Sequence, residues 1–246
     1  MNKIIHRDWQ RKMMIQDNKI DVYKQQVGEV GASLVSSGMK VGLGSGSTAA
    51  WVVRALGRRW QEENLRFIGV PTSVETAQLA ESFGIKLSTL GETPELDLDI
   101  DGADEVTYQD FHLIKGLGGA LLREKIVRYA SKQFIVVVDE RKMVDRLGDH
   151  TPVPVEVAPF GWQVTAKHLE KIGASIEIRM KKGSSDFFIT DGQNMILDCQ
   201  FGQISDPCGL SKEINAIVGV MENGLFTYCT DEVLIAGQKG IQHLKK

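Results

Sequence analysis

The chain has 246 residues, of which 42% are hydrophobic and 25% charged, and its net charge is -3. This length and balance fit one large folded domain, or a large domain with a small one, and exclude a largely disordered chain. The weak negative charge gives no sign of a nucleic-acid partner, because such partners usually meet a basic face.

The three cysteines, Cys199, Cys208 and Cys229, are scattered and odd in number. They form no Cys-x-x-Cys pair, so they indicate neither a disulfide framework nor a metal site, and they favour a reducing, cytoplasmic location. The five histidines show no metal-ligand spacing either. We therefore expect no metal.

Residues 1–20 predict a polar N-terminal extension, because their apolar clusters are too short for the core of a signal peptide. The longest strongly apolar run near the middle of the chain covers residues 134–138, far short of a membrane span. We expect no membrane partner.

Strand-like and helix-like segments alternate over the first two-thirds of the chain. The expected strands cover residues 41–43, 67–70, 85–87, 96–100 and 134–138. The expected helices cover residues 47–56, 74–83 and 121–130. Such alternation predicts an α/β fold with a mostly parallel sheet, in which ligands bind at the carboxyl ends of the strands.

The pattern changes after about residue 148. An extended link with two prolines is expected over residues 151–155, and a small α+β domain over residues 149–222. Within that domain we expect helices at 163–172 and 212–217, and strands at 176–180, 187–190, 195–198 and 218–221. The tail, residues 224–235, predicts strands that rejoin the first sheet, so residues 21–148 and 223–246 are expected to form one domain.

A glycine- and hydroxyl-rich loop, Gly42-Leu-Gly-Ser-Gly-Ser-Thr48, joins the first strand to its helix. The N–H groups at a helix N-terminus, with the hydroxyls of Ser45, Ser47 and Thr48, suit a phosphate. An ordinary capped turn would show the same pattern. The loop lacks the third glycine of the dinucleotide fingerprint and the lysine of the Walker A motif.

Three carboxylates follow the strand expected at residues 96–100. The run Asp97-Leu-Asp-Ile-Asp-Gly102 imitates the start of a calcium loop, but its twelfth position is Tyr108 rather than Glu, so we reject calcium. Asp101 and Asp104 can gather on one side of the following turn. A solvated acidic turn would have the same sequence pattern.

A second glycine loop begins at Lys115 and leads into a helix that carries Glu124. Lys115 can offer a positive charge to an oxyanion or phosphate. Glu124 is a candidate base, although a carboxylate near a helix N-terminus can simply complement the helix dipole. Lys142 follows a buried strand and is either an anion ligand or part of a solvated turn.

Together these blocks resemble the type A ribose-5-phosphate isomerase family, from about Asp21 to about Gly237. The acidic block and the Lys-to-Glu block are specific in combination, whereas the glycine loop alone is not. The matching blocks are Gly42-Leu-Gly-Ser-Gly-Ser-Thr-Ala49, Pro71-Thr-Ser73, Asp99-Ile-Asp-Gly-Ala-Asp-Glu105, Lys115-Gly-Leu-Gly-Gly-Ala-Leu-Leu-Arg-Glu-Lys125 and Pro152-Val-Pro-Val-Glu156.

The resemblance implies a Rossmann-like α/β domain with a small α+β, ferredoxin-like lid, and assembly into a homodimer or homotetramer. It implies interconversion of ribose 5-phosphate and ribulose 5-phosphate in the non-oxidative pentose phosphate pathway, with Glu124 as general base. The residues that it places around the sugar phosphate are Ser45, Gly46, Ser47, Thr48, Asp101, Gly102, Ala103, Asp104, Lys115, Gly116, Leu117, Gly118 and Lys142.

This reaction moves a proton between C2 and C1 through an ene-diolate, which a positioned carboxylate such as Glu124 can catalyse. Because no electron leaves the substrate overall, we expect no nicotinamide and no other redox cofactor. Lys115 and the amides of residues 116–119 are expected to stabilise the oxyanion. Asp101 is the candidate for ring opening, and Asp104 for orienting hydroxyls. A helix N-terminus and a lysine would lower the pKa of Glu124 whereas burial would raise it, and the sequence leaves the balance open.

Other functions remain alternatives: a related amino-sugar phosphate deaminase or coenzyme A transferase, an inactive sugar-phosphate sensor, and a nicotinamide dehydrogenase. The block from Lys115 to Glu124 favours the isomerase over the first two. The first twenty residues are too short for the DNA-binding unit that a sensor usually adds. Ser47 breaks the dinucleotide fingerprint of a dehydrogenase.

Overall fold

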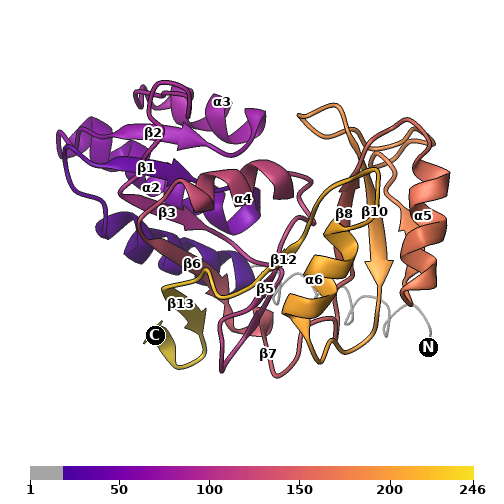
Figure 1. Ribbon diagram of the computed structural model, residues 1–246. Helices are drawn as coiled ribbons and strands as arrows, with labels where there is room; N and C mark the ends of the chain where they lie inside the picture. The colour runs from indigo at the N-terminus through magenta and orange to yellow at the C-terminus, as the bar shows by residue number, and fades with distance from the viewer. Residues whose placement is uncertain (1–18) are drawn as a thin grey trace, which may run out of the picture.

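The computed structural model describes residues 19–246. The extension predicted over residues 1–20 lies outside this range except for its last two residues, which belong to a helix that runs to residue 33. Figure 1 shows a large sheet with its helices on the left and a smaller sheet with helices on the right.

The large sheet has six strands in the order β14-β13-β6-β3-β1-β2. The pairings from β13 to β2 are parallel, and β14 pairs antiparallel with β13. The mostly parallel α/β fold predicted from the sequence is therefore confirmed. The strands are β1 (Lys40–Leu43), β2 (Ile68–Pro71), β3 (Leu98–Asp101), β6 (Phe134–Asp139), β13 (Glu232–Gly237) and β14 (Gly240–Lys245).

Helices cover both faces of the large sheet. The helix over residues 19–33 and α2 (Gly46–Glu62) lie on one face and share a core with it. On the other face lies α4 (Leu121–Tyr129), where Val127 packs with the buried Leu96. Because α4 also contacts the smaller sheet, it lies between the two layers (Figure 1). The remaining helix of this part, α3 (Val74–Ser82), packs against α2 and β2.

The smaller sheet has the order β11-β8-β10-β9, with every pairing antiparallel. Its chain order is β8-α5-β9-β10-α6-β11, which is the ferredoxin-like arrangement expected from the family resemblance. The elements are β8 (Val153–Val157), α5 (Trp162–Lys171), β9 (Ser175–Ile178), β10 (Met195–Gln200), α6 (Pro207–Asn215) and β11 (Val220–Asn223). We call this the ferredoxin-like sheet.

The prediction of an extended link over residues 151–155 is wrong for residues 153–155, which belong to the inner strand β8. Proline usually argues against an inner strand, since it lacks the N–H that a ladder needs. Pro154 is tolerated because the carbonyl of Gly224, which faces it beyond the end of β11, accepts a 2.9 Å hydrogen bond from the N–H of Lys115 instead. The Pro154 carbonyl still accepts a hydrogen bond from Gly224 N–H.

Several other boundaries differ from the sequence-based expectation. The strands expected at 85–87 and 187–190 form isolated bridges only. The helix expected at 212–217 begins earlier, at Pro207, because Asp206 caps it and proline fits a first turn. The tail divides: β13 rejoins the large sheet, whereas β12 (Leu225–Phe226) joins a third sheet with β4 (Glu105–Thr107), β5 (Leu113–Ile114) and β7 (Met143–Val144). The predicted domain boundaries near 148 and 223 stay a prediction.

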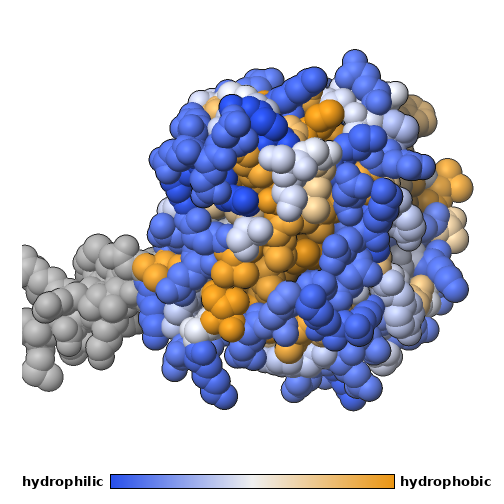
Figure 2. Space-filling view, turned by 90° about the vertical axis from the view of Figure 1, so that its left-hand side faces the viewer, coloured by the Kyte–Doolittle hydropathy of each residue, from blue (hydrophilic) through white to orange (hydrophobic). Residues whose placement is uncertain are grey.

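The face shown in Figure 2 is mostly polar, with a band of apolar residues across it. Folded proteins expose much apolar surface, so the band by itself assigns no partner. Among the residues that the structure describes, no helix is both long and apolar enough to cross a membrane.

Candidate active site

A cavity of about 150 Å³ lies where three neighbouring parallel strands end. β1 leads into residues 44–48, β3 into residues 102–104, and β6 into the short helix η1 (Glu140–Lys142). Since parallel strands end at the same edge of a sheet, blocks far apart in the sequence meet there. The lining residues are Lys24, Ser45, Gly46, Ser47, Thr48, Gly102, Ala103, Asp104, Lys115, Gly116, Gly118, Glu124, Arg141 and Lys142.

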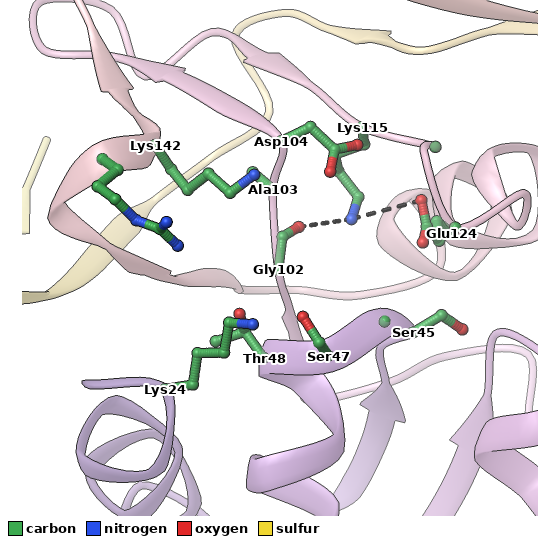
Figure 3. A pocket seen from close by; sticks show the side chains of 14 residues that line it. Lys24, Ser45, Ser47, Thr48, Gly102, Ala103, Asp104, Lys115, Glu124 and Lys142 are labelled. Carbon is green, nitrogen blue, oxygen red and sulfur yellow. Dashed lines mark hydrogen bonds and ion pairs between the residues drawn. The ribbon is translucent and has the colours of Figure 1, made fainter. Parts of the chain in front are cut away.

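Lys115 links two carboxylates at one end of this cavity. Its ammonium nitrogen lies 2.9 Å from Asp101 Oδ2 and 3.4 Å from Glu124 Oε2. It also donates a 2.6 Å hydrogen bond to the carbonyl of Gly102, as Figure 3 shows. All three charged side chains are at least 96% buried. The cluster thus brings together three charged residues, Lys115, Asp101 and Glu124, that the sequence placed in separate blocks.

Burial raises the pKa of Glu124 to about 8, although the nearby Lys115 pulls it down. Asp101 and Asp104 add to the upward shift, because a second negative charge opposes ionisation. Burial likewise raises the pKa of Asp101, although Lys115 and the hydrogen bonds from two backbone N–H groups lower it. Burial alone would lower the pKa of Lys115, but Asp101 and Glu124 outweigh it and raise this pKa. The sequence left open whether burial or the nearby positive charges would dominate the pKa of Glu124. In the structure burial dominates, so this pKa lies above its ordinary value.

Asp101 is held by the backbone of the first glycine loop. Its Oδ1 accepts hydrogen bonds from the N–H groups of Ser45 (3.0 Å) and Gly102 (2.7 Å). The carboxylate fills the space beside Gly44, where a Cβ would stand 2.2 Å from Oδ1 and 2.5 Å from the Asp101 Cα. One glycine of the loop therefore makes room for a side chain of this protein rather than for a ligand.

We predict that Gly44→Ala displaces Asp101 and lowers kcat/KM at least about tenfold, with a loss of about 1–3 kcal/mol in the free energy of unfolding. The backbone must move, because the clash includes the Cα of Asp101 as well as its carboxylate. Kinetics and urea unfolding measure the two effects. Gly91→Ala is the control, since its Cβ would meet Thr89 at an ordinary 3.6 Å. Equal behaviour of the two variants would contradict this account.

Asp104 lines the cavity and fixes the second glycine loop. Its Oδ2 accepts a 2.9 Å hydrogen bond from the N–H of Leu117. Leu117 is 42% exposed and is not among the residues that line the cavity. Asp101 is not among them either, because it lies buried at Lys115. Gly119 does not line it, and its N–H donates a 2.9 Å hydrogen bond to the Gly116 carbonyl instead. The remaining residues that the sequence nominated do line the cavity.

The hydroxyl of Ser45 is committed to the protein itself. It lies 2.7 Å from Thr72 Oγ1 and 2.8 Å from Ser73 Oγ, in a cluster that also includes Thr76. In Figure 3 the Ser45 side chain points away from the other labelled residues, whereas Ser47 and Thr48 lie along the cavity. Ser45 thus anchors the loop to the turn before α3.

The end of the cavity away from Glu124 is cationic, with Lys24 and Lys142 around it (Figure 3). Arg141 also lines the cavity. The N-terminus of α2 opens there, and its first turn carries no acidic residue. Helix N-termini and basic side chains together favour an anion. Arg141 adjoins the Lys142 that the sequence singled out. Lys24 was missed because no motif surrounds it: it reaches the cavity only through the packing of the helix over residues 19–33.

Within the described residues, no group of three or more His, Cys, Asp or Glu side chains is arranged to hold a metal ion. At one end the cavity holds the buried carboxyl group of Glu124 beside the Lys115 ammonium, and at the other end it is lined by cationic side chains. This arrangement suits proton transfer on a small anionic substrate.

Comparisons with known proteins agree with this chemistry. Residues 68–240 match the family model for ribose 5-phosphate isomerase A (phosphoriboisomerase A). The ribose-5-phosphate isomerase A of Gloeobacter violaceus is 51% identical over 225 residues, covering 92% of this chain and 96% of that protein. The enzyme of the same name from Synechococcus is 49% identical, covering 92% of this chain and 98% of that protein.

Solved structures give the same result. The ribose 5-phosphate isomerase A of Methanocaldococcus jannaschii superimposes with a TM-score of 0.87 at 46% identity, covering 91% of this chain and 98% of that one. A D-ribose-5-phosphate isomerase in complex with phospho-erythronic acid superimposes with a TM-score of 0.89 at 37% identity, covering 92% of this chain and 99% of that one. The chain, an aldose–ketose isomerase by these matches, belongs to the ribose 5-phosphate isomerase A family.

Proposed function

We propose that Glu124 carries the proton between C2 and C1 when this enzyme interconverts ribose 5-phosphate and ribulose 5-phosphate. The supporting observation is the place of Glu124, buried at the cavity wall with its Oε2 3.4 Å from the Lys115 ammonium. A pKa of about 8 suits this role, since a base works best when its pKa lies near the working pH.

Lys115 stabilises the negative charge that develops on O1 and O2 of the ene-diolate. Its ammonium is nearly fully buried, and electrostatic stabilisation is strongest where water is excluded. The N–H groups of Gly116 and Gly118 add to it, since both residues line the cavity and neither N–H bonds to another described residue. The charge is thus met by donors already in place.

The phosphate binds at the cationic end, among Lys24, Arg141 and Lys142, with Ser47 and Thr48 at the N-terminus of α2. It takes no part in the chemistry, but its binding energy holds the sugar with C1 and C2 toward Glu124. Phospho-erythronic acid, the ligand of a relative, is expected to bind here with its phosphate in the same place.

Ring opening involves Asp101 and Asp104 in this proposal. Asp104 lines the cavity and orients the sugar hydroxyls. Asp101 does not line the cavity, and it works through the Lys115 ammonium to which it is paired at 2.9 Å.

The pH dependence of ketose formation from ribose 5-phosphate tests the base. Because Glu124 must be ionised to accept the proton, kcat/KM is expected to fall about tenfold between pH 9 and pH 7, with an apparent pKa of about 8. The second pKa of the substrate phosphate lies near 6, so a change in kcat/KM centred near pH 8 reflects ionisation of the enzyme. A flat profile between pH 6.5 and 9 would overturn the assignment, and absence of ketose from folded protein would overturn the reaction.

The proposal includes a homodimer or homotetramer in the cytoplasm. The cytoplasmic location is supported by the three cysteines, because none of them forms a disulfide in the described chain. Light scattering after size-exclusion chromatography would determine the assembly.

A further inference from the structure

The second glycine loop is held by an arginine from the ferredoxin-like sheet. Arg179 follows β9, and its guanidinium donates through one nitrogen, Nη1, to the carbonyls of Gly116 (2.7 Å) and Leu117 (3.0 Å). Asp198 of β10 fixes the guanidinium from the other side, accepting from Nε at 2.9 Å and from Nη2. The Arg179 side chain is 11% exposed. It is therefore a buried, paired group with a defined geometry.

These two carbonyls belong to peptides whose N–H groups face the active site. In a trans peptide the C=O and N–H point in opposite directions. The peptide between Gly116 and Leu117 gives its carbonyl to Arg179 and its N–H to Asp104 Oδ2. The next peptide gives its carbonyl to Arg179, so the N–H of Gly118 points away from Arg179. That N–H bonds to no described residue, and Gly118 lines the cavity.

We infer that Arg179 is a positioning residue that holds the peptide between Leu117 and Gly118 with its N–H directed at the substrate oxyanion. This inference rests on the proposed function of the loop amides. It explains why a side chain outside the cavity is bound to two consecutive carbonyls of a glycine loop.

The loop needs such a clamp because glycine permits a peptide to turn over. Gly116 has φ +99° and Gly119 φ +84°, a region that glycine enters freely. If the peptide before Gly118 turned over, its carbonyl would face the cavity and repel the ene-diolate. Phe188, in the segment between β9 and β10 of the ferredoxin-like sheet, occupies the space beside Gly119, where a Cβ would stand 2.4 Å from its ring. The ferredoxin-like part thus holds the loop at two points.

Arg179→Met tests the clamp by removing the donors while keeping side-chain length. We expect kcat to fall about 10- to 100-fold with little change in KM. This is less than the roughly 10²- to 10³-fold loss on deleting an oxyanion donor, because the donor remains but is no longer held. The kcat of Arg179→Lys should lie between those of the wild type and Arg179→Met, since an ammonium cannot bind Asp198 and two carbonyls in the same geometry.

Ligand binding separates this role from a purely structural one. Phospho-erythronic acid carries a carboxylate that stands in for the oxyanion, and erythritol 4-phosphate is the same chain without it. Arg179→Met should weaken the acid about tenfold or more and leave the polyol phosphate unchanged. Equal losses for both ligands, or an unchanged kcat, would overturn the inference. If the Met variant fails to fold, the same comparison is made with Arg179→Lys.

Arg123→Met is the matched control. Arg123, in α4, pairs with Asp191 from the segment between β9 and β10, so it also links the two sheets' layers, but it does not touch the glycine loop. It should retain kcat and both affinities within about threefold. A loss in Arg123→Met equal to that in Arg179→Met would show that docking of the two parts, and not the clamp, is responsible. Activity in Glu124→Gln would instead count against the proposed base, so the two failures are distinguishable.

Discussion

Glu124→Gln is expected to lower kcat by about 10³- to 10⁴-fold in both directions of the reaction. A positioned base contributes roughly 10²–10⁴, and here a single carboxylate removes the proton and returns it. Glutamine keeps the shape of the side chain but cannot accept the proton. The anion-binding end of the cavity does not involve Glu124, so affinity for phospho-erythronic acid should change by less than about tenfold.

Isotope exchange makes this test specific. The wild-type enzyme should exchange the C2 proton of ribose 5-phosphate with deuterium from solvent, and Glu124→Gln should not, because the proton passes through the carboxyl group. NMR measures the exchange directly. A variant that keeps more than about a tenth of the wild-type rate would assign the base to another residue.

Lys115→Met is expected to affect stability as well as catalysis. It removes the cation that is shared by Asp101 and Glu124 and leaves two carboxyl groups in a buried place. Breaking a buried ion pair by removing one partner costs about 3–5 kcal/mol. Loss of the oxyanion partner should lower kcat about 10²- to 10³-fold in addition.

The stability loss should depend on pH. Lys115 holds down the pKa of both carboxyl groups, so without it both values rise further above those of the unfolded chain. A carboxyl group with a raised folded pKa is destabilising once it must ionise, and stability falls as pH rises through that pKa. Urea unfolding should therefore show a large loss at pH 9 and a smaller one at pH 5.

Lys142→Met is the matched control for Lys115→Met, since Lys142 lines the same cavity but is no partner of Asp101 or Glu124. It should raise KM through weaker phosphate binding and leave the free energy of unfolding within about 0.5 kcal/mol of wild type. If Lys115→Met is as stable as Lys142→Met at pH 9, the carboxyl groups are not held by Lys115.

The local sequence was sufficient for most regular elements of the large sheet. The buried strand β6 and the helices α3 and α4 lie within about one residue of their expected ranges, because apolar periodicity and capping act over a few residues. Two of the failures occurred where a proline stands in a regular element. Pro154 in β8 and Pro207 in α6 are tolerated because of neighbours distant in sequence or a side-chain cap, which local patterns do not show.

The chemical identity of the site was also set by the sequence. The glycine loop, the acidic turn and the Lys-to-Glu block supplied Glu124, Lys115 and Asp101 before any contact was known. The types of these residues suit proton transfer and charge stabilisation. Their blocks meet because the parallel strands that precede two of them end at the same edge.

Only the tertiary structure decided how these groups act on one another. The pKa of Glu124 depends on the balance between burial, which raises it, and Lys115, which lowers it. Burial is a property of packing among segments distant in sequence. The place of Gly44 beside Asp101 follows from the pairing of β1 with β3. Lys24 and Arg179 carry no local signature, because each reaches the site from an element packed against it. The sequence by itself nominated Glu124, Lys115 and Asp101, whose motifs are local. The three-dimensional packing determined their charge, direction and partners, and it brought in residues that no motif marks.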